Sequence, residues 1–356
     1  MGLICFFNSA IAWGGGEKWH FEVSAYLHSK GHPVIVFAHS KSVLWQKLQE
    51  AGIPSVPVTI NNLSFINPIK RQKIYTELKK VAPETIVLNL SRDLKIAGSC
   101  AKAAGVKRII YRRGSAIPIK NSFLNRHYFK NVLTDVLANS QATKKTVLEK
   151  NPNLFSEDKI RVIYNGIRIP ESEETAVPPS TFTLVNLGRL EAQKNQLFLV
   201  RLAKELKVRQ IPAKIIIGGE GRLRSELEQE IKKRGVSDSV KLEGFIEEPL
   251  EFMAKGTLFV LPSLWEGFGY VLAEAALQKK AIIAFDLSSN PELVLQNKTG
   301  ILVEPNNIHA FADAVEKLYN DPALSKKMGQ AGYQHVLTHF DKKENIKKIE
   351  SYLVNG

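Results

Sequence analysis

The strongest constraint on the fold is a pattern in which short apolar runs alternate with longer, polar, helix-like segments. In the first half the helix-like segments include 17–30, 70–81 and 141–149. The apolar runs of strand length that they separate are 3–7, 34–38, 85–89, 108–112 and 135–140. Strands that alternate with helices are typical of βαβ units, which build a parallel sheet covered by helices. The first half is therefore predicted to be an α/β domain.

The same pattern starts again after a break at residues 169–181, IPESEETAVPPST, which are rich in Pro, Glu, Ser and Thr and lack periodicity. We place a linker there, at 171–181, between a domain over 1–170 and a second domain over 182–334. The apolar runs of the second domain are 183–188, 213–219, 240–245, 257–262 and 281–286. The fold class is α/β, with two doubly wound domains. Ligands of such sheets bind beyond the carboxyl ends of the strands, so two domains that face each other would form a cleft.

Length and composition agree with a protein of two domains without a membrane span. The 356 residues fit two domains of ordinary size. Cys5 and Cys100 provide no disulfide framework, which favours a reducing, cytoplasmic compartment. The apolar run 3–7 is short for a signal peptide and has no Lys or Arg before it, so we read it as a strand. The charged segment 335–356 is expected to be a C-terminal helix that either stays solvated or packs back on the first domain.

The excess of positive charge lies entirely in the first half of the chain. Residues 1–170 hold 25 basic and 10 acidic residues, a net charge of +15, whereas residues 171–356 hold 24 and 25, a net charge of −1. A basic half beside a neutral half indicates that the first domain meets an anionic partner. Nucleic acid, a membrane surface and a phosphorylated substrate all satisfy this requirement.

Several predicted strands end in residues suited to binding an anion. The glycines of AWGGGEK (12–18) precede a helix, whose N-terminal N–H groups can face a phosphate, although a plain turn has the same composition. Arg189 and Lys194 of GRLEAQKN (188–195) lie just after a strand, where two cations can neutralise a diphosphate, although taken alone they could equally be two solvent-exposed charges. Beyond the strand that ends in KLEGF (241–245), Phe245 and Ile246 could form a wall against a nucleobase, with ordinary packing as the alternative.

The segment LWEGFGYVLAEAALQKK (264–280) contains two carboxylates in different settings. Glu266 stands in a glycine loop after a strand, and Glu274 lies in an apolar helical run that begins near Tyr270. A buried carboxylate needs hydrogen-bond donors, and sugar hydroxyls would supply them. A glutamate on a helix surface is the alternative for Glu274.

In these motifs the chain resembles the retaining glycosyltransferases of family 4, which have the GT-B fold of two Rossmann-like domains facing across a cleft. The resemblance covers nearly the whole length and also includes LANS (137–140), VIYNGI (162–167) and GGEGRLRSELE (218–228). It implies transfer of a sugar from a UDP-, GDP- or ADP-linked donor to a hydroxyl of a glycan or lipid-linked glycan. Such acceptors belong to the synthesis of cell-surface polysaccharide, lipopolysaccharide or glycolipid.

The resemblance also implies a role for each site residue. Glu266 would bind hydroxyls of the donor sugar, and Gly267, Phe268 and Gly269 would contact the sugar and phosphate through their backbone. Glu274 would hold the ribose. Arg189 and Lys194 would bind the departing diphosphate and, with Glu266, form the catalytic set. Gly15 and Gly16 would close over the phosphates from the first domain.

One region departs from the family pattern. Many relatives carry a histidine in the first domain, whereas here the segment 109–121 contains Arg112 and Arg113 and no histidine. We therefore assign no catalytic histidine, and expect the arginine pair to bind an anionic acceptor or the donor phosphate, or else to be ordinary surface residues. Family members generally need no metal, and neither a metal-ligand cluster nor an Asp-x-Asp motif stands out in the sequence.

The acceptor domain is expected to approach a membrane. The segment LSFINPIKRQKIYTELKK (63–80) mixes aliphatic and aromatic residues with Lys and Arg, a composition that suits an anionic lipid surface, although a solvated helix has a similar one. The protein is thus expected to be cytoplasmic and peripheral on the inner face of the membrane.

Two rival functions fit parts of the sequence. A sugar-nucleotide 2-epimerase of the same fold would use the same donor cleft without an acceptor. A basic, non-enzymatic nucleic-acid-binding protein would match the charge of the first half. It would need a recognition motif or aromatic residues on a basic face, and neither is found.

Overall fold

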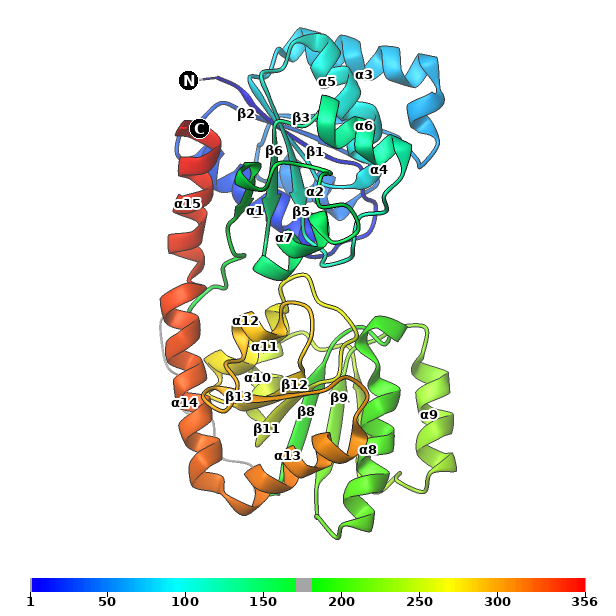
Figure 1. The fold of residues 1–356 in the computed structure, drawn as a ribbon, viewed down its shortest axis with the longest axis vertical. Helices are drawn as coiled ribbons and strands as arrows, with labels where there is room; N and C mark the ends of the chain where they lie inside the picture. Colours follow the sequence, from blue (N-terminus) through cyan, green and yellow to red (C-terminus); the bar gives the residue numbers. More distant parts are fainter. Residues whose placement is uncertain (1, 171–180, 356) are drawn as a thin grey trace. The chain divides into compact units, whose positions relative to one another are not determined.

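The computed structural model describes residues 2–170 and 181–355, which form two compact units (Figure 1). Unit 1 contains the residues up to Asn165 together with those from Lys343 onward, and unit 2 runs from Gly166 to Lys342. The two α/β domains of the predicted fold class are thus present. Of the predicted linker 171–181, residues 171–180 lie outside the described residues.

Each unit is built on a sheet whose strand pairs are all parallel. The seven strands of unit 1 have the order β3-β2-β1-β4-β5-β6-β7. Their bounds are β1 Ile4–Asn8, β2 Val34–Ala38, β3 Ser55–Pro57, β4 Thr85–Leu88, β5 Arg108–Arg113, β6 Asp135–Ala138 and β7 Ile160–Val162. The six strands of unit 2 have the order β10-β9-β8-β11-β12-β13. They are β8 Thr183–Leu187, β9 Lys214–Gly218, β10 Val240–Gly244, β11 Leu258–Leu261, β12 Ala281–Phe285 and β13 Gly300–Val303.

Helices cover both faces of the sheet in unit 1. Side chains of α1, α2 and α15 pack on one face, and side chains of α3, α5, α6 and α7 pack on the other. The helical segments of this unit are α1 Gly15–Ser29, α2 Val43–Glu50, η1 Ser64–Ile66, α3 Pro68–Val81, α4 Ser91–Asp93, η2 Leu94–Gly98, α5 Ser99–Ala104, α6 Phe123–Asn131, α7 Gln141–Leu148, η3 Glu157–Lys159 and α15 Lys342–Asn355.

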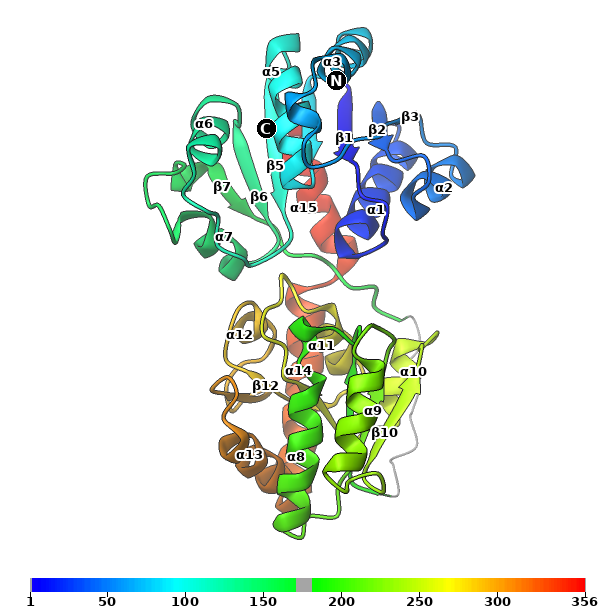
Figure 2. The same ribbon diagram turned by 90° about the vertical axis from the view of Figure 1, so that its right-hand side faces the viewer.

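Unit 2 has the same layered construction (Figure 2). Helices α8, α9 and α13 pack on one face of its sheet, and α10, α11 and α14 contact the strands from the other. The helical segments are η4 Ala192–Lys194, α8 Gln196–Val208, α9 Arg224–Lys233, α10 Pro249–Ala254, α11 Tyr270–Leu277, α12 Asn290–Leu293, α13 Ile308–Asn320 and α14 Pro322–His339. No helix in the described ranges is long and apolar enough to cross a membrane.

The strand order places the functional candidates. In unit 2 the chain winds outward from β8 through β9 to β10, and then returns to pair β11 with the other side of β8. A crevice for ligands lies at such a switch point, outside the carboxyl ends of the two central strands. Arg189 and Lys194 follow β8, and Glu266 follows β11. In unit 1 the equivalent point lies between β1 and β4.

The expected helix over 335–356 is two helices, because the backbone between them has other partners. Helix α14 ends at His339 and α15 begins at Lys342. The N–H of Ile167 donates to the carbonyl of Phe340 at 2.8 Å, and the N–H of Lys342 donates to the carbonyl of Ile167 at 3.0 Å. These bonds replace the ones that would continue the helix. Beyond the break, Ile346, Ile349 and Leu353 of α15 are buried in the core of unit 1.

Candidate functional site

A buried ion pair stands at the switch point of unit 2. The Nζ of Lys194 lies 2.6 Å from the Oε1 of Glu266, although the two residues are 72 positions apart. The side chains are 13% and 8% exposed. An ion pair so far removed from water interacts more strongly than one on the surface, and loss of either partner would leave a buried charge unpaired. The structure thus joins two of the predicted site residues.

The segment that carries Lys194 also holds the backbone of the Glu266 loop. The N–H of Leu264 donates to the carbonyl of Gln193 at 2.8 Å, and the Gln193 side chain donates to the carbonyl of Trp265 at 2.7 Å. The Nδ2 of Asn195 donates to the carbonyl of Pro262 at 3.2 Å. Gln193 and Asn195 did not enter the sequence-based site, because an amide side chain within a polar turn carries no pattern that names its partner.

A third segment, after β12, completes the hold on Glu266. The N–H of Glu266 donates to the Oγ of Ser288 at 3.2 Å, and the same hydroxyl donates to the carbonyl of Glu266 at 2.5 Å. Ser289 donates to that carbonyl as well, at 3.3 Å. Ser288 has a backbone φ of +55°, which is uncommon for a residue with a side chain. The sequence carries no signal for this contact.

The glycine loop after Glu266 forms the N-terminal end of α11. Gly269 caps the helix with a φ of +79°, a conformation that favours glycine. Phe268 is 3% exposed and packs against the rings of Tyr270 and Phe340, so only its backbone can face a ligand. Glu274 is half-buried on α11, with the buried Ala273 and Ala275 on either side.

Other predicted residues of unit 2 lie in more open positions. Arg189 is exposed, and its guanidinium makes no ion pair within residues 2–170 and 181–355. Phe245 is 78% exposed beyond β10. Ile246 is half-buried beside Gly218, where a Cβ would lie 2.6 Å from the Cγ1 of Ile246. One predicted cation is therefore available to an incoming anion, whereas the other, Lys194, already contacts a carboxylate.

The glycines predicted to close over phosphates lie at the first turn of α1 in unit 1. A Cβ on Gly16 would lie 2.9 Å from the Nδ2 of Asn89, so a close approach of this side chain accounts for the glycine. Asn89 in turn donates to the Oε1 of Glu17 at 3.0 Å, and Asn8 donates to the same oxygen at 3.3 Å. Gly15 is the first residue of the helix. The glycine run therefore packs the start of α1 against the end of β4.

The two arginines at the end of β5 have different surroundings. Arg112 is 3% exposed, with its guanidinium 4.9 Å from the centre of the Trp19 ring, and it donates to Asn89 and Asn165. Arg113 is half-buried and donates to the carbonyls of Ser115 and Ile117, at 3.2 and 2.6 Å. Neither arginine is an ordinary surface residue.

His20, which the sequence did not single out, is buried close to Arg112. Its ring packs edge-on against Phe6 and Trp19, and neither ring nitrogen has a hydrogen-bond partner in the described part of the chain. Burial, together with the positive charge of Arg112, holds the pKa of His20 well below its usual value. The ring is therefore neutral at physiological pH.

A second buried polar group occupies the switch point of unit 1. The carboxylate of Asp93 is fully buried and accepts from the hydroxyl of Ser9 at 2.5 Å and from the N–H of Leu90 at 3.0 Å. Arg92 donates to the same hydroxyl at 2.8 Å. Burial raises the pKa of Asp93 to about 7, against the opposing effect of these hydrogen bonds. Across the described ranges no group of three or more His, Cys, Asp or Glu side chains is placed to hold a metal ion.

Two family models match the two halves of the chain. The model described as Glycosyltransferase Family 4 matches residues 13–169, and the model described as Glycosyl transferases group 1 matches residues 168–335. The solved structure of Anabaena HepE in complex with UDP superposes with a TM-score of 0.85 at 19% identity, covering 100% of both chains. That likeness shows the fold, which is GT-B.

Curated relatives match over part of their length. An alpha-D-kanosaminyltransferase of Streptomyces kanamyceticus is 34% identical over 40% of this chain and 38% of its own. A Campylobacter jejuni N-acetylgalactosamine-N,N'-diacetylbacillosaminyl-diphospho-undecaprenol 4-alpha-N-acetylgalactosaminyltransferase is 29% identical over 54% of this chain and 52% of its own. The chain thus spans about half or less of these relatives. With both family models accounting for residues 13–335, the chain belongs to the family 4 glycosyltransferases.

Proposed function

We propose that this protein is a retaining glycosyltransferase that moves a sugar from a nucleoside-diphosphate sugar to a hydroxyl of a glycan or lipid-linked glycan. The observation that carries the proposal is the arrangement at the switch point of unit 2. There the segment 189–195 provides two cations and also holds the loop of Glu266. The bond to be broken joins a sugar to a diphosphate, so cations suit one side of it and a carboxylate that accepts from sugar hydroxyls suits the other.

Each side chain then has a role in the reaction. The exposed guanidinium of Arg189 receives the diphosphate, and the carboxylate of Glu266 accepts hydrogen bonds from the sugar hydroxyls. Glu274 accepts from the ribose. As the bond to the sugar breaks, negative charge grows on the diphosphate, and Arg189, Lys194 and the N–H groups of the 267–269 loop stabilise it. These positive groups supply charge stabilisation from the protein itself, without a metal ion.

UDP is the first candidate for the nucleotide, because the structural neighbour HepE is described in complex with UDP. Phe245, exposed beyond β10, provides a ring against which a base can stack. The acceptor is proposed to be a glycan on a lipid diphosphate, as the name of the Campylobacter jejuni relative describes for that enzyme. In unit 1, the half-buried Arg113 is proposed to face such an acceptor, and the buried Arg112 beside it adds positive charge without direct contact.

The donor site is tested by thermal unfolding with UDP, GDP and ADP. A nucleotide at 100 times its dissociation constant should stabilise the protein by about 2.7 kcal/mol. Arg189→Ala should abolish the stabilisation, because it removes the cation proposed to receive the diphosphate. The guanidinium is exposed, so its loss should not disturb the fold. Arg201→Ala, which removes another exposed arginine of unit 2, is the matched control and should retain it. A wild-type protein that no nucleotide stabilises would refute the proposal.

The stereochemistry is tested on the product. A donor with an α-linked sugar should yield an α-linked product, read from the coupling constant of the anomeric proton. Turnover should be unaffected by EDTA. A β-linked product would show that the reaction inverts the anomeric carbon, and would refute the retaining mechanism while leaving the donor site in place.

We further propose that unit 1 lies on an anionic membrane through the start of α3. Leu63, Ile66 and Ile69 are 66%, 64% and 80% exposed at and just before the first turn of this helix. The helix itself, residues 68–81, holds five basic residues and one acidic residue. Interfacial binding has two elements: apolar side chains enter the lipid, and cations beside them meet the anionic headgroups.

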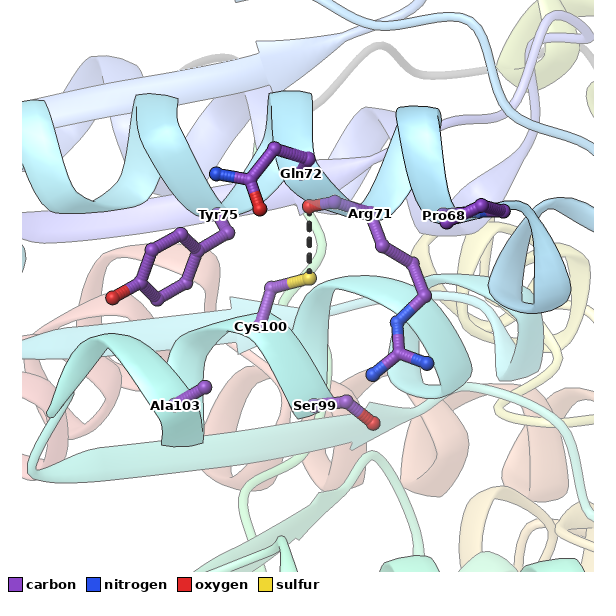
Figure 3. A pocket seen from close by; sticks show the side chains of 7 residues that line it. All are labelled: Pro68, Arg71, Gln72, Tyr75, Ser99, Cys100 and Ala103. Atoms are coloured by element: carbon purple, nitrogen blue, oxygen red, sulfur yellow. Dashed lines mark hydrogen bonds between the residues drawn. The ribbon is translucent and has the colours of Figure 1, made fainter.

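A pocket of about 350 Å³ lies beside these residues, between α3 and α5 (Figure 3). Arg71, Gln72 and Tyr75 line it from α3, and Ser99 and Cys100 line it from α5. The thiol of Cys100 donates to the carbonyl of Arg71, which ties the two helices together. A guanidinium with neighbouring hydroxyl and amide groups suits the phosphate of a lipid headgroup.

The membrane proposal is tested by sedimentation with vesicles at low salt. Vesicles that contain phosphatidylglycerol should bind the protein, and Ile66→Ser together with Ile69→Ser should weaken the binding. Val208→Ser, which replaces a 68% exposed residue of unit 2, should not. Equal partition with and without anionic lipid would overturn the proposal and leave the donor site untouched.

A further inference from the structure

A side chain that contacts the backbone of Glu266 comes from a part of the chain outside the motifs that carry the family resemblance. Ser288 lies in the turn after β12, 22 positions from Glu266. Its hydroxyl accepts from the N–H of Glu266 and donates to the carbonyl of the same residue. One side chain therefore binds both backbone polar groups of the residue whose carboxylate is proposed to meet the sugar.

The backbone of Ser288 indicates that this contact has a cost. A φ of +55° is a strained conformation for a residue with a Cβ, and glycine would adopt it more readily. Strained residues persist where surrounding interactions over-determine them, and they cluster at functional sites. Here serine is present although glycine would relieve the strain, and the feature that serine adds is the hydroxyl on Glu266.

Lys194 holds the carboxylate of Glu266, whereas the contacts with its backbone polar groups come from Ser288 and its neighbour. Gln193 and Asn195 bond to the backbone of residues 262–265, ahead of Glu266. Ser289 reaches only the carbonyl of Glu266, at the longer distance of 3.3 Å. The Ser288 hydroxyl thus makes the shortest side-chain contact with the backbone of Glu266, while Lys194 contacts its carboxylate.

We propose that Ser288 is a positioning residue for the transfer reaction, holding the Glu266 backbone so that its carboxylate faces the donor sugar. This inference rests on the proposed function. It predicts a loss of recognition of the sugar without a loss of recognition of the nucleotide, because Arg189 and the base-stacking residue lie in other segments.

The experiment compares dissociation constants for UDP and UDP-glucose, GDP and GDP-mannose, and ADP and ADP-glucose. For the pair that binds, Ser288→Ala and Ser288→Gly should each weaken binding of the nucleotide sugar about tenfold relative to the bare nucleotide. That is the effect of losing one hydrogen bond between a sugar hydroxyl and the charged Glu266 carboxylate. The constants for the bare nucleotide should stay within about twofold of wild type.

Glycine at position 288 separates positioning from folding. Ser288→Gly relieves the backbone strain, so its melting temperature should equal or exceed that of Ser288→Ala while the shift in binding is the same. Asn297→Gly is the matched control, because Asn297 is exposed in the same unit with a φ of +58° and should lose nothing in binding. In a Glu266→Ala background, the Ser288 substitutions should change the ratio no further.

The outcomes distinguish the inference from the proposed function. If the wild type binds none of the nucleotides, both the proposed function and the inference on Ser288 are refuted. If it binds one, and Ser288→Gly keeps the wild-type ratio, only the inference on Ser288 is overturned. A Ser288→Ala variant that weakens the nucleotide and the nucleotide sugar equally would overturn it as well.

Discussion

Replacement of Lys194 by methionine should destabilise unit 2, because it leaves the Glu266 carboxylate buried without its cation. Two unit charges 2.6 Å apart attract by about 6 kcal/mol at an effective dielectric constant of 20. Most of this attraction is offset by the cost of removing both groups from water. Breaking one partner of such a pair typically costs 3–5 kcal/mol, and we expect about 3 kcal/mol here, since Glu266 retains some access to water.

The double variant Lys194→Met with Glu266→Gln removes both charges and should recover about 2 kcal/mol of this loss. The measurement is equilibrium unfolding in urea, followed by the fluorescence of Trp265, the single tryptophan of unit 2, in a background without the tryptophans at 13, 19 and 45. Lys207→Met breaks an exposed pair with Asp238 and should have no measurable effect. The reasoning fails if Lys194→Met changes the unfolding free energy by less than about 1 kcal/mol. It also fails if the effects of Lys194→Met and Glu266→Gln on that free energy simply add in the double variant, because the pair is then not a desolvated one.

The remaining predictions concern three other positions. His20→Phe should stabilise the protein by about 1 kcal/mol, by removing a buried ring without hydrogen bonds. Because the pKa of His20 is lowered in the folded protein, the unfolded chain takes up the proton first as pH drops below about 6.5, and wild-type stability should fall there. Urea titrations at about pH 5 and 7 should show a smaller loss of stability for His20→Phe than for wild type. The pH dependence due to Asp93 has the opposite sign. With its pKa raised to about 7, wild type should lose stability as pH rises from about 4 to 7. Identical pH profiles of stability for Asp93→Asn and wild type would contradict this. Gly269→Ala should lower the stability by about 1–2 kcal/mol, because the residue has a φ of +79°, and it should also weaken donor binding. The control Gly105→Ala, with a φ of +84° and open space around it, should lower the stability equally in thermal unfolding and leave binding intact.

The place of the candidate site could be predicted from the sequence because it depends on patterns of short range. Apolar runs located β8 and β11, and their central place in a doubly wound sheet brought Arg189, Lys194 and Glu266 to one edge. The strands that the sequence reading missed carry too weak a signal. In β3 and β7, three residues each, no alternation can develop, and β13 follows a polar turn without a long apolar run.

The contacts within the site could not be predicted, because they join residues far apart in the chain. No spacing rule connects Lys194 to Glu266, or Ser288 to the backbone of Glu266. The same holds for Arg112, for which the sequence leaves both a binding role and a surface position open. The packing of α1 on the sheet brings the ring of Trp19 against its guanidinium. Side chains that meet across a sheet edge are set by three-dimensional packing, of which a linear pattern contains no record.

The assignment of α15 to unit 1 has a consequence for how the protein is made. On the ribosome, unit 1 is the earlier to emerge, yet part of its core, Ile346, Ile349 and Leu353, is translated only after all of unit 2. Until then the apolar face that α15 covers stays open, and the bonds of Glu350 to Tyr26 and His32 cannot form. Unit 2, which is continuous in sequence, can fold as soon as it is released. The half of the protein that is synthesised first is thus completed last, and it is the half that a chaperone would have to protect.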